Sequence, residues 1–578
     1  SLSACSADDV QVNSPKGQFV GEGLTVDGRT VFRFLGIPYA KPPIGPLRFA
    51  RPQPADSVGG DNYQAKQWPP ICVQNTKSPM AGNSAHMGKA KNMSEDCLYL
   101  NVWSPAELKL GSTLNSDQLK PVIVWIHGGG LVIGTSSFDL YDGEMLAAKA
   151  DAIVVTFNYR VSTLGFLYSD DVAAADVKGN QGFWDQNQAL KWVKANIGAF
   201  GGRADQVTVM GESAGGWSVS AHILSPASRG LFQRAILQSG ALTSFPMITE
   251  PAVHVRRLLT GIRSVTGCAT QADTSITASV VECLRRLPAK KVDELFYQIE
   301  QDPFEPLVPV AVIDGEFITE KPEKMLSSGS YQKNISLLVS TVEDEGSFVI
   351  AMYGGAVPGL KATDPAPYSL AEAETFLPDL LSKHIFTGAN GYPLVNASSS
   401  EDIKKTYFSG FSAGNASQAD EWRKRVGVAF GDLAIGCPTL NFAREVFKGA
   451  ASTTAKVYQW YFNSKLGAEK FICHPWAGAC HCNELYGVFG MPFRYPEQYL
   501  EREREISGEV IGFIGAFIRT GTPGPQHSEW LPYSMAEGGK LVAPYYEINN
   551  GPKVPANFKV NLKSQECDQV WKRYYNNN

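Results

Sequence analysis

The first residues whose types and spacing indicate chemistry are Gly211-Glu-Ser213-Ala-Gly215. The apolar residues 207–210 before them are typical of a strand, and residues 214–224 after them are predicted to form a helix. A G-x-S-x-G sequence between a strand and a helix is the context of a nucleophile elbow, where small flanking residues permit a sharp turn that exposes the serine hydroxyl. The pattern therefore predicts that Ser213 is a nucleophile, beside helix amides that favour negative charge.

A second motif, His127-Gly-Gly-Gly130, follows the apolar residues 122–126, another predicted strand. Consecutive glycines permit a backbone whose amides point into a cleft, and such donors stabilise the oxyanion that forms when a carbonyl is attacked. A flexible turn is the simpler interpretation of three glycines. With an elbow serine on a later strand, the motif favours an oxyanion hole.

A serine hydroxyl becomes an effective nucleophile only when a base takes its proton and an acid orients that base. In chains with a nucleophile elbow the order is serine, acid, histidine. Of the eight histidines, His481 lies in the loop where the base is expected, after a predicted strand late in the chain. The acid should end an earlier strand, and the candidates are Glu343, Asp344 and Glu345. Spacing alone does not choose among these three.

The elements that must position these residues alternate between strands and helices. Strands are predicted at 122–126, 153–157, 207–210, 234–238, 335–340 and 456–462, and helices at 145–150, 183–197, 214–224 and 563–575. Such alternation predicts an α/β-hydrolase fold with a large mixed, mostly parallel central sheet and helices on both faces. Residues 1–578 are expected to form a single catalytic domain with small N-terminal hairpins and long insertions.

Composition excludes several classes of protein. The chain is 44% hydrophobic and 19% charged, which is ordinary for a globular enzyme with a large core. Its net charge of −5 gives no basic surface for nucleic acid. No uninterrupted apolar stretch is long enough to be a membrane span.

Ten cysteines and four Asn-x-Ser sequons indicate the secretory pathway. The candidate glycosylation sites are Asn92, Asn334, Asn396 and Asn415. The chain begins at Ser1 without an apolar leader, so we expect a secreted, extracellular protein from which a signal peptide has been removed.

Taken together, the motifs resemble those of the type-B carboxylesterase/lipase family, which includes cholinesterases and the neuroligin adhesion proteins. The resemblance covers essentially the whole chain. Its matching stretches are Phe34-Leu-Gly-Ile-Pro-Tyr-Ala40, Ser94-Glu-Asp-Cys-Leu-Tyr-Leu-Asn101, His127-Gly-Gly-Gly130, Gly211-Glu-Ser-Ala-Gly-Gly216, Arg234-Ala-Ile-Leu-Gln-Ser-Gly240, Asp344-Glu-Gly346 and His481 followed by Glu484-Leu.

The resemblance implies a role for each matching residue. The family acid is the glutamate of the Asp-Glu-Gly step, here Glu345, which joins Ser213 and His481 in a catalytic triad. The oxyanion donors correspond to the amides of Gly129, Gly130 and Ala214. Glu212, Ser239 and Glu484 match polar residues around the triad, for which simple hydrogen-bonded burial is an equal interpretation. No cofactor is implied.

The resemblance also implies three disulfides: Cys72 with Cys97, Cys268 with Cys283, and Cys437 with Cys567. Four cysteines are left over, of which three lie in the run Cys473-His474…Cys480-His481-Cys482. This run contains residue types that zinc prefers. We expect no metal, because His481 is needed as the base, and favour a bridge from Cys473 to Cys480 or Cys482.

The expected substrate is a short- to medium-chain carboxylic ester. Cholinesterases bind the quaternary ammonium on a tryptophan ten residues before the equivalent of Cys97, and this chain has Met87 there, which presents no aromatic face. Residues 73–96, which correspond to a lipase lid, contain three lysines and several amides and suit lipid poorly. The candidate pocket residues are Met87, Glu212, Phe304, Leu307 and Phe348.

Two alternatives remain beside a soluble-substrate esterase. One is a lipase or sterol esterase that acts at a lipid interface. The other is a binding or scavenging protein in which Ser213 is acylated once and turns over slowly. The sequence does not indicate the oligomeric state.

Overall fold

The computed structural model describes most of the chain. Its described residues are 9–58, 62–75, 89–90, 92–108, 114–244, 248–300, 311–348, 397–410, 418–450, 454–467, 476–551 and 557–572.

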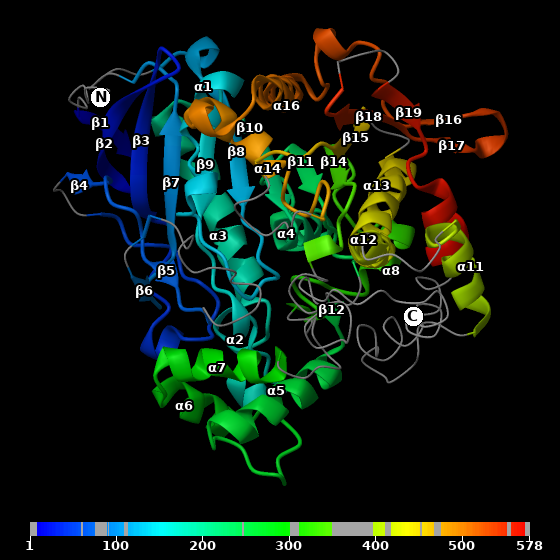
Figure 1. The fold of residues 1–578 in the computed structure, drawn as a ribbon. Helices are drawn as coiled ribbons and strands as arrows, with labels where there is room; N and C mark the ends of the chain where they lie inside the picture. The colour runs from blue at the N-terminus through cyan, green and yellow to red at the C-terminus, as the bar shows by residue number, and fades with distance from the viewer. Residues whose placement is uncertain are drawn as a thin grey trace.

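A large mixed sheet forms the centre of the molecule (Figure 1). Its strand order is β1-β2-β3-β7-β9-β8-β10-β11-β14-β15-β18-β19, with β4 (Tyr63–Gln64) beside β2. The run from β9 to β18 is parallel throughout, and the strands at either side of it are antiparallel. The parallel strands are β8 (Lys120–Ile126), β9 (Ile153–Phe157), β10 (Gly202–Glu212), β11 (Arg234–Gln238), β14 (Ser336–Val342), β15 (Val457–Asn463) and β18 (Pro544–Asn549).

The parallel strands are apolar on both faces because helices cover both faces. Residues along β8 alternate between two apolar clusters. Val122 and Val124 belong to one cluster, whereas Ile123 and Trp125 belong to the other. Helices α3 (Gln181–Asn196) and α4 (Ala214–Leu224) pack into the first cluster. Helices α1 (Glu144–Ala150) and α16 (Glu501–Thr520) pack into the second. This arrangement confirms the predicted α/β-hydrolase architecture.

The N-terminal residues form the expected hairpins. Strands β1 (Asp9–Ser14), β2 (Gly17–Val26) and β3 (Arg29–Pro38) pair antiparallel in chain order. Strand β3 then pairs with β7 (Tyr99–Ser104), which joins the hairpins to the parallel strands through β9. Strand β7 was not among the predicted strands.

Three helices gather at one end of the molecule, away from the sheet (Figure 1). They are α5 (Pro251–Val265), α6 (Ala278–Arg286) and α7 (Ala289–Glu300), and they share an apolar cluster of their own. The Cys268–Cys283 disulfide ties the segment after α5 to α6. The prediction of one domain over residues 1–578 stays a prediction.

One helical stretch among the described residues, Asp420–Gly449, is long and apolar enough to cross a membrane by length and composition. It comprises α12 (Gln418–Gly431), a π-helical turn η11 (Asp432–Gly436) and most of α13 (Cys437–Ala450). Asp432 interrupts its apolar run, and 89% of its most apolar window is buried within the fold. A core helix passes the same test, so this stretch is weak evidence for a span.

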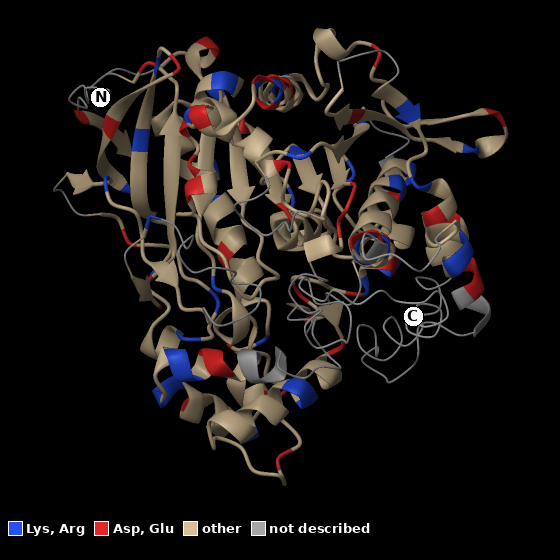
Figure 2. Cartoon of the chain, viewed as in Figure 1, with Lys and Arg blue, Asp and Glu red and all other residues tan. Residues whose placement is uncertain are grey.

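The last predicted helix, at 563–575, is helical over residues 564–572, and residues 573–575 lie outside the described part of the chain. A π-helical segment, η17, covers Glu566–Trp571, and Cys567 within it is bonded to Cys437 at the start of α13. Before it, strand β19 (Phe558–Val560) pairs antiparallel with β18. Acidic and basic residues are interspersed over these and the other elements (Figure 2).

Candidate functional site

Ser213 occupies the turn between β10 and α4, as its sequence context predicts. Its backbone has φ 58° and ψ −123°, a combination that non-glycine residues rarely adopt and that costs about 1–3 kcal/mol. The Ser213 amide donates to the carbonyl oxygen of Gln238 on β11 at 2.9 Å, and the Ser213 carbonyl accepts from the Trp217 amide at 2.9 Å. Strained backbone held by neighbouring hydrogen bonds is the geometry of a nucleophile elbow.

The turn depends on a close approach between α4 and strand β8. A Cβ placed on Gly215 would lie 2.1 Å from the carbonyl oxygen of Ile126, the last residue of β8. No side chain fits at that distance, so Gly215 lets the helix begin directly over the strand that carries the glycine motif. Ser213 and the glycine loop are therefore brought to one edge of the sheet.

The loop His127–Gly130 begins where β8 ends. Gly129 and Gly130 have φ values of +110° and +63°, and both are partly exposed. The amides of Val132 and Ile133 both donate to the Gly129 carbonyl at 3.0 Å, which holds the loop in shape. A Cβ placed on Gly128 would lie 3.1 Å from the Cβ of Ser213, so this loop passes beside the serine.

The ring of His127 anchors the start of the loop. It stacks on Tyr159 with centroids 4.3 Å apart, and the Tyr159 hydroxyl donates to the His127 carbonyl at 2.9 Å. Burial lowers the pKa of His127 to about 4, so the ring is neutral. His127 is therefore a structural residue, and sequence reasoning did not identify the role of Tyr159.

Glu345 and His481 form a buried pair. Nδ1 of His481 lies 2.7 Å from Oε2 of Glu345, and the two side chains are 4% and 1% exposed. The second carboxylate oxygen of Glu345 accepts from the Val342 amide at 2.9 Å, which holds the carboxylate toward the histidine. A carboxylate on Nδ1 leaves Nε2 as the nitrogen that can exchange a proton with a nucleophile.

The other two acidic candidates lie near a lysine instead. Nζ of Lys424 lies 3.6 Å from Oδ1 of Asp344 and 3.9 Å from Oε2 of Glu343. Of the three consecutive acids that spacing left open, Glu345 is the one whose carboxylate contacts the histidine.

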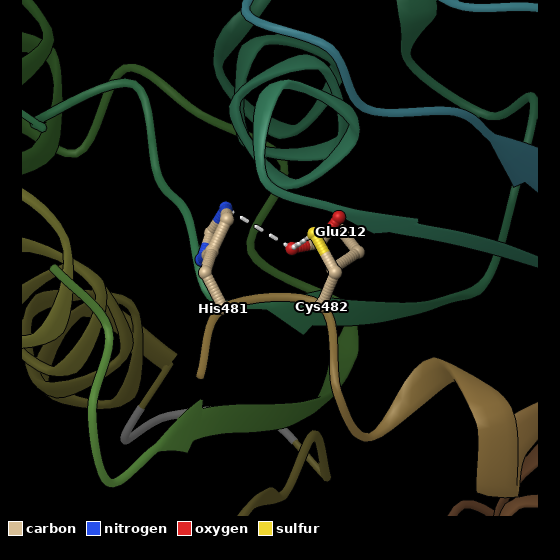
Figure 3. A group of neighbouring side chains, drawn as sticks. All are labelled: Glu212, His481 and Cys482. Atoms are coloured by element: carbon tan, nitrogen blue, oxygen red, sulfur yellow. Dashed lines mark hydrogen bonds and ion pairs between the residues drawn. The ribbon is translucent and has the colours of Figure 1, made fainter. Parts of the chain in front are cut away.

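Nε2 of His481 has no hydrogen-bond partner among the described residues. It lies 3.2 Å from Oε1 of Glu212, the residue before Ser213 (Figure 3). The imidazole stacks on Phe348 with centroids 4.5 Å apart and planes 17° apart. Glu212 and Phe348, two of the candidate pocket residues, thus both contact the histidine.

Buried carboxylates dominate the electrostatics around His481. Burial raises the pKa of Glu212 to about 7, and burial together with the Glu212 charge raises that of Glu484. Burial by itself lowers the pKa of His481, but the charges of Glu212 and Glu345 outweigh it and raise this pKa to about 9. The site therefore favours the imidazolium form of His481.

The remaining sequence predictions fall in different places. Ser239 has φ 49° and a buried hydroxyl that has no hydrogen-bond partner within the described part of the chain. Oε1 of Glu484 accepts from Gln238 at 3.3 Å. Asn92 and Asn334 are exposed, as glycosylation requires. Met87, Phe304, Leu307, Asn396 and Asn415 lie outside the described residues.

The structure contains the three disulfides that the family resemblance implies, Cys72–Cys97, Cys268–Cys283 and Cys437–Cys567. Cys480 is also disulfide-bonded, and its partner is not among the described cysteines. Cys482 is a free thiol that donates to Oε1 of Glu212 at 3.1 Å. The sequence analysis offered Cys482 as one of two bridge partners of Cys473, and that alternative is wrong because Cys482 is free.

One group among the described residues has the composition and spacing of a metal site. The potential ligand atoms of Glu212, His481 and Cys482 all lie within 4.8 Å of one another.

Comparison with known proteins identifies the family. A family model described as "Carboxylesterase family" matches residues 8–570. The chain belongs to the carboxylesterase family. As a member, this carboxylesterase is a serine hydrolase of carboxylic esters, and its mixed sheet with helices on both faces is the α/β-hydrolase fold of that family.

Three curated relatives of this carboxylesterase are similar over nearly their whole length. Acetylcholinesterase of Bungarus fasciatus is 32% identical, covering 97% of this chain and 86% of the relative. Acetylcholinesterase of Leptinotarsa decemlineata is 31% identical, covering 94% and 83%. Acetylcholinesterase-1 of Trittame loki is 32% identical, covering 91% and 89%.

Proposed function

We propose that the chain hydrolyses short- to medium-chain carboxylic esters through an acyl-enzyme on Ser213, with His481 as base and Glu345 as the acid that orients it. The observation that carries the proposal is the 2.7 Å contact between Nδ1 of His481 and Oε2 of Glu345, both buried. A neutral histidine held in this way presents Nε2 as the proton acceptor.

In the first step, Nε2 of His481 takes the proton of Ser213 while the serine oxygen attacks the ester carbonyl. The resulting imidazolium is stabilised by Glu345 on one nitrogen and by Glu212, 3.2 Å away, on the other. The alcohol then leaves with the proton from His481. Because Glu212 also attracts this proton, it makes the imidazolium easier to form and slows the transfer of its proton to the leaving alcohol.

The oxyanion of each tetrahedral intermediate is assigned to the amides of Gly129, Gly130 and Ala214. Support comes from the glycine loop that passes beside Ser213 and from Ala214 at the first position of α4, where amides have no helical partner. Water then attacks the acyl-enzyme, with His481 again acting as base. Loss of one such donor typically costs about 10²–10³ in kcat.

The preference for uncharged esters rests on the apolar surface next to the base. Phe348 stacks on His481 and is buried, which gives the acyl or alkyl group an apolar neighbour. Met87 stands where a choline-binding tryptophan is expected, and a thioether gives a cation much less attraction than an aromatic face.

Hydrolysis of choline esters is the second candidate, because the three relatives are named acetylcholinesterases. The two candidates differ in one measurable ratio. The kcat/KM for p-nitrophenyl butyrate should exceed that for acetylthiocholine if the substrate is an uncharged ester. A higher value for acetylthiocholine would contradict the proposal and favour the second candidate.

The proposed nucleophile is tested with Ser213→Ala. We expect the variant to lose sustained hydrolysis of p-nitrophenyl butyrate while keeping its fold. A hydrolysis rate that rises when the concentration of a longer ester exceeds its solubility limit would favour a lipase. A single burst of product without steady turnover in the wild type would favour a scavenging protein.

We further propose that the protein is secreted and glycosylated at Asn92, Asn334, Asn396 and Asn415. Disulfides form and persist in oxidising compartments, and this chain holds three between described cysteines. A mass decrease on treatment with an N-glycosidase, smaller in Asn92→Gln/Asn334→Gln and lost when all four asparagines are replaced, would test the glycosylation.

A further inference from the structure

A free thiol lies next to the proposed catalytic base. Cys482 follows His481 directly, has φ 71° and is partly exposed, whereas seven other described cysteines are in disulfides. Its Sγ lies 3.1 Å from Oε1 of Glu212, 270 residues earlier in the chain. The proposed ester hydrolysis has no step for this thiol.

The thiol completes a set of three ligand types that zinc binds. Oε1 of Glu212 lies 3.2 Å from Nε2 of His481 and 3.1 Å from Sγ of Cys482, and all three ligand atoms lie within 4.8 Å of one another (Figure 3). Tetrahedral zinc with bonds of about 2.0–2.3 Å separates neighbouring ligand atoms by about 3.3–3.6 Å. The two distances from Oε1 of Glu212 are therefore a few tenths of an ångström short of this separation, and the third, between Nε2 of His481 and Sγ of Cys482, is at most 4.8 Å.

One imidazole nitrogen faces this set. Nε2 of His481 has no hydrogen-bond partner among the described residues, its contact being the 3.2 Å ion pair with Glu212, and the side chain is 4% exposed. Nδ1 on the other side of the ring is held by Glu345 at 2.7 Å. A zinc-binding histidine usually binds the cation through one ring nitrogen and donates the N–H of the other to a carboxylate or carbonyl.

The charge of the site also suits a divalent cation. Glu212, Glu345 and Glu484 are each about 1% exposed or less, so three carboxylates share one histidine in a buried space. A bound divalent cation would offset the thiolate and one carboxylate.

This set differs from the Cys473–Cys482 run that suggested zinc in the sequence. Cys480 is disulfide-bonded and cannot be a ligand, whereas Glu212 comes from β10, far away in the chain. The partial exposure of Cys482 gives a metal ion access from solvent.

We propose that Glu212, His481 and Cys482 bind a thiophilic divalent cation, Zn²⁺ or Cd²⁺, and that the bound cation inhibits ester hydrolysis. Binding forms metal–sulfur and metal–nitrogen bonds, and the thiol proton of Cys482 and the Nε2 proton of the His481 imidazolium are released to solvent. The cation occupies the Nε2 lone pair of His481, which can then no longer accept the proton of Ser213. The inhibition rests on the proposed function, whereas the binding does not.

Binding is tested with Cd²⁺ alone, followed by its thiolate charge-transfer absorption in the ultraviolet and by calorimetry. The intact protein should give this band with one equivalent of Cd²⁺, and Cys482→Ser should not. Cys482→Gly serves as a second variant, because glycine adopts a φ of +71° readily. Glu484→Gln is the matched control, since it removes a buried carboxylate of the same cluster but no ligand, and it should keep the band.

Inhibition is tested with Zn²⁺ in the p-nitrophenyl butyrate assay, with each protein normalised to its own metal-free rate. The wild type should be inhibited and should recover with EDTA. Half-inhibition of Cys482→Ser should need at least about tenfold more Zn²⁺, since even the loss of an outer partner of a ligand typically costs 10–100-fold in affinity.

Three results would overturn the proposal: no Cd²⁺ band in the wild type, an unchanged band in both Cys482 variants, or equal Zn²⁺ inhibition of wild type and variants. A Cd²⁺ band that depends on Cys482, in a protein without ester turnover, would support the metal site and contradict the proposed function instead.

Discussion

Oε2 of Glu345 lies 2.7 Å from Nδ1 of His481, although 136 residues separate them in the chain. The contact forms because β14 and β15 are parallel neighbours, so the segments after their carboxyl ends meet at one edge of the sheet. The same edge holds the end of β10, where Glu212 and Ser213 lie. Strand topology therefore assembles the site from three distant segments.

Glu345→Gln should lower kcat about 10⁴-fold with little change in KM, because an amide can hold the histidine in the wrong tautomer and does not stabilise its cation. Steady-state hydrolysis of p-nitrophenyl butyrate checks this. Glu343→Gln is the matched control, since Glu343 faces Lys424 at 3.9 Å and should leave kcat almost unchanged. Equal losses in the two variants would contradict the assignment of Glu345.

The acid limb of the pH profile of kcat/KM should lie well above pH 6.5. His481 must be neutral to accept a proton, and Glu212 and Glu345 outweigh burial to raise its pKa to about 9. Glu212→Gln removes the charge 3.2 Å from Nε2, lowers this pKa and should move the limb to lower pH. A limb that stays in place, or moves to higher pH, would show that Glu212 does not set the pKa of the base.

Gly215→Ala should destabilise the fold and reduce activity, because its Cβ would lie 2.1 Å from the Ile126 carbonyl oxygen. Overpacking typically costs about 1–3 kcal/mol, and here backbone must move. Gly512→Ala on α16 is the control: its Cβ meets no atom within 4 Å, and alanine should raise helix stability by up to about 1 kcal/mol. Relative to the wild type, urea unfolding should show a lower free energy of unfolding for Gly215→Ala and a higher one for Gly512→Ala.

Asp185→Asn should lower the free energy of unfolding by about 3–5 kcal/mol, since it leaves the buried Arg160 charge without its counterion. Asp185 accepts from Nε and Nη2 of Arg160 at 2.8 and 2.7 Å, and both side chains are buried. The exposed pair Lys291–Glu294 offers a contrast, and Glu294→Gln should change stability by less than about 1 kcal/mol. Similar unfolding midpoints for Asp185→Asn and Glu294→Gln would contradict the prediction that the buried ion pair matters more for stability than the exposed one.

Local pattern was enough to predict many elements. The predicted strand at 234–238 and helix at 214–224 coincide with β11 and α4, because the apolar period and the Gly-rich turns that define them lie within a few residues. The Ser213 turn was predictable for the same reason. Strands β7 and β18 were missed, since their mixed polar and aromatic residues are apolar only where neighbouring strands cover them.

The sequence by itself predicted the fold class and the elbow serine and, through the family resemblance, implied Glu345 as the acid. The tertiary structure places the Glu345 carboxylate 2.7 Å from His481, which spacing along the chain had left open, and it alone decided that Nε2 faces Glu212. It also brought Glu212 within 3.1 Å of the free thiol of Cys482. The physical reason is that periodicity and turn chemistry act over a few residues, whereas these contacts join strand ends that only sheet pairing brings together.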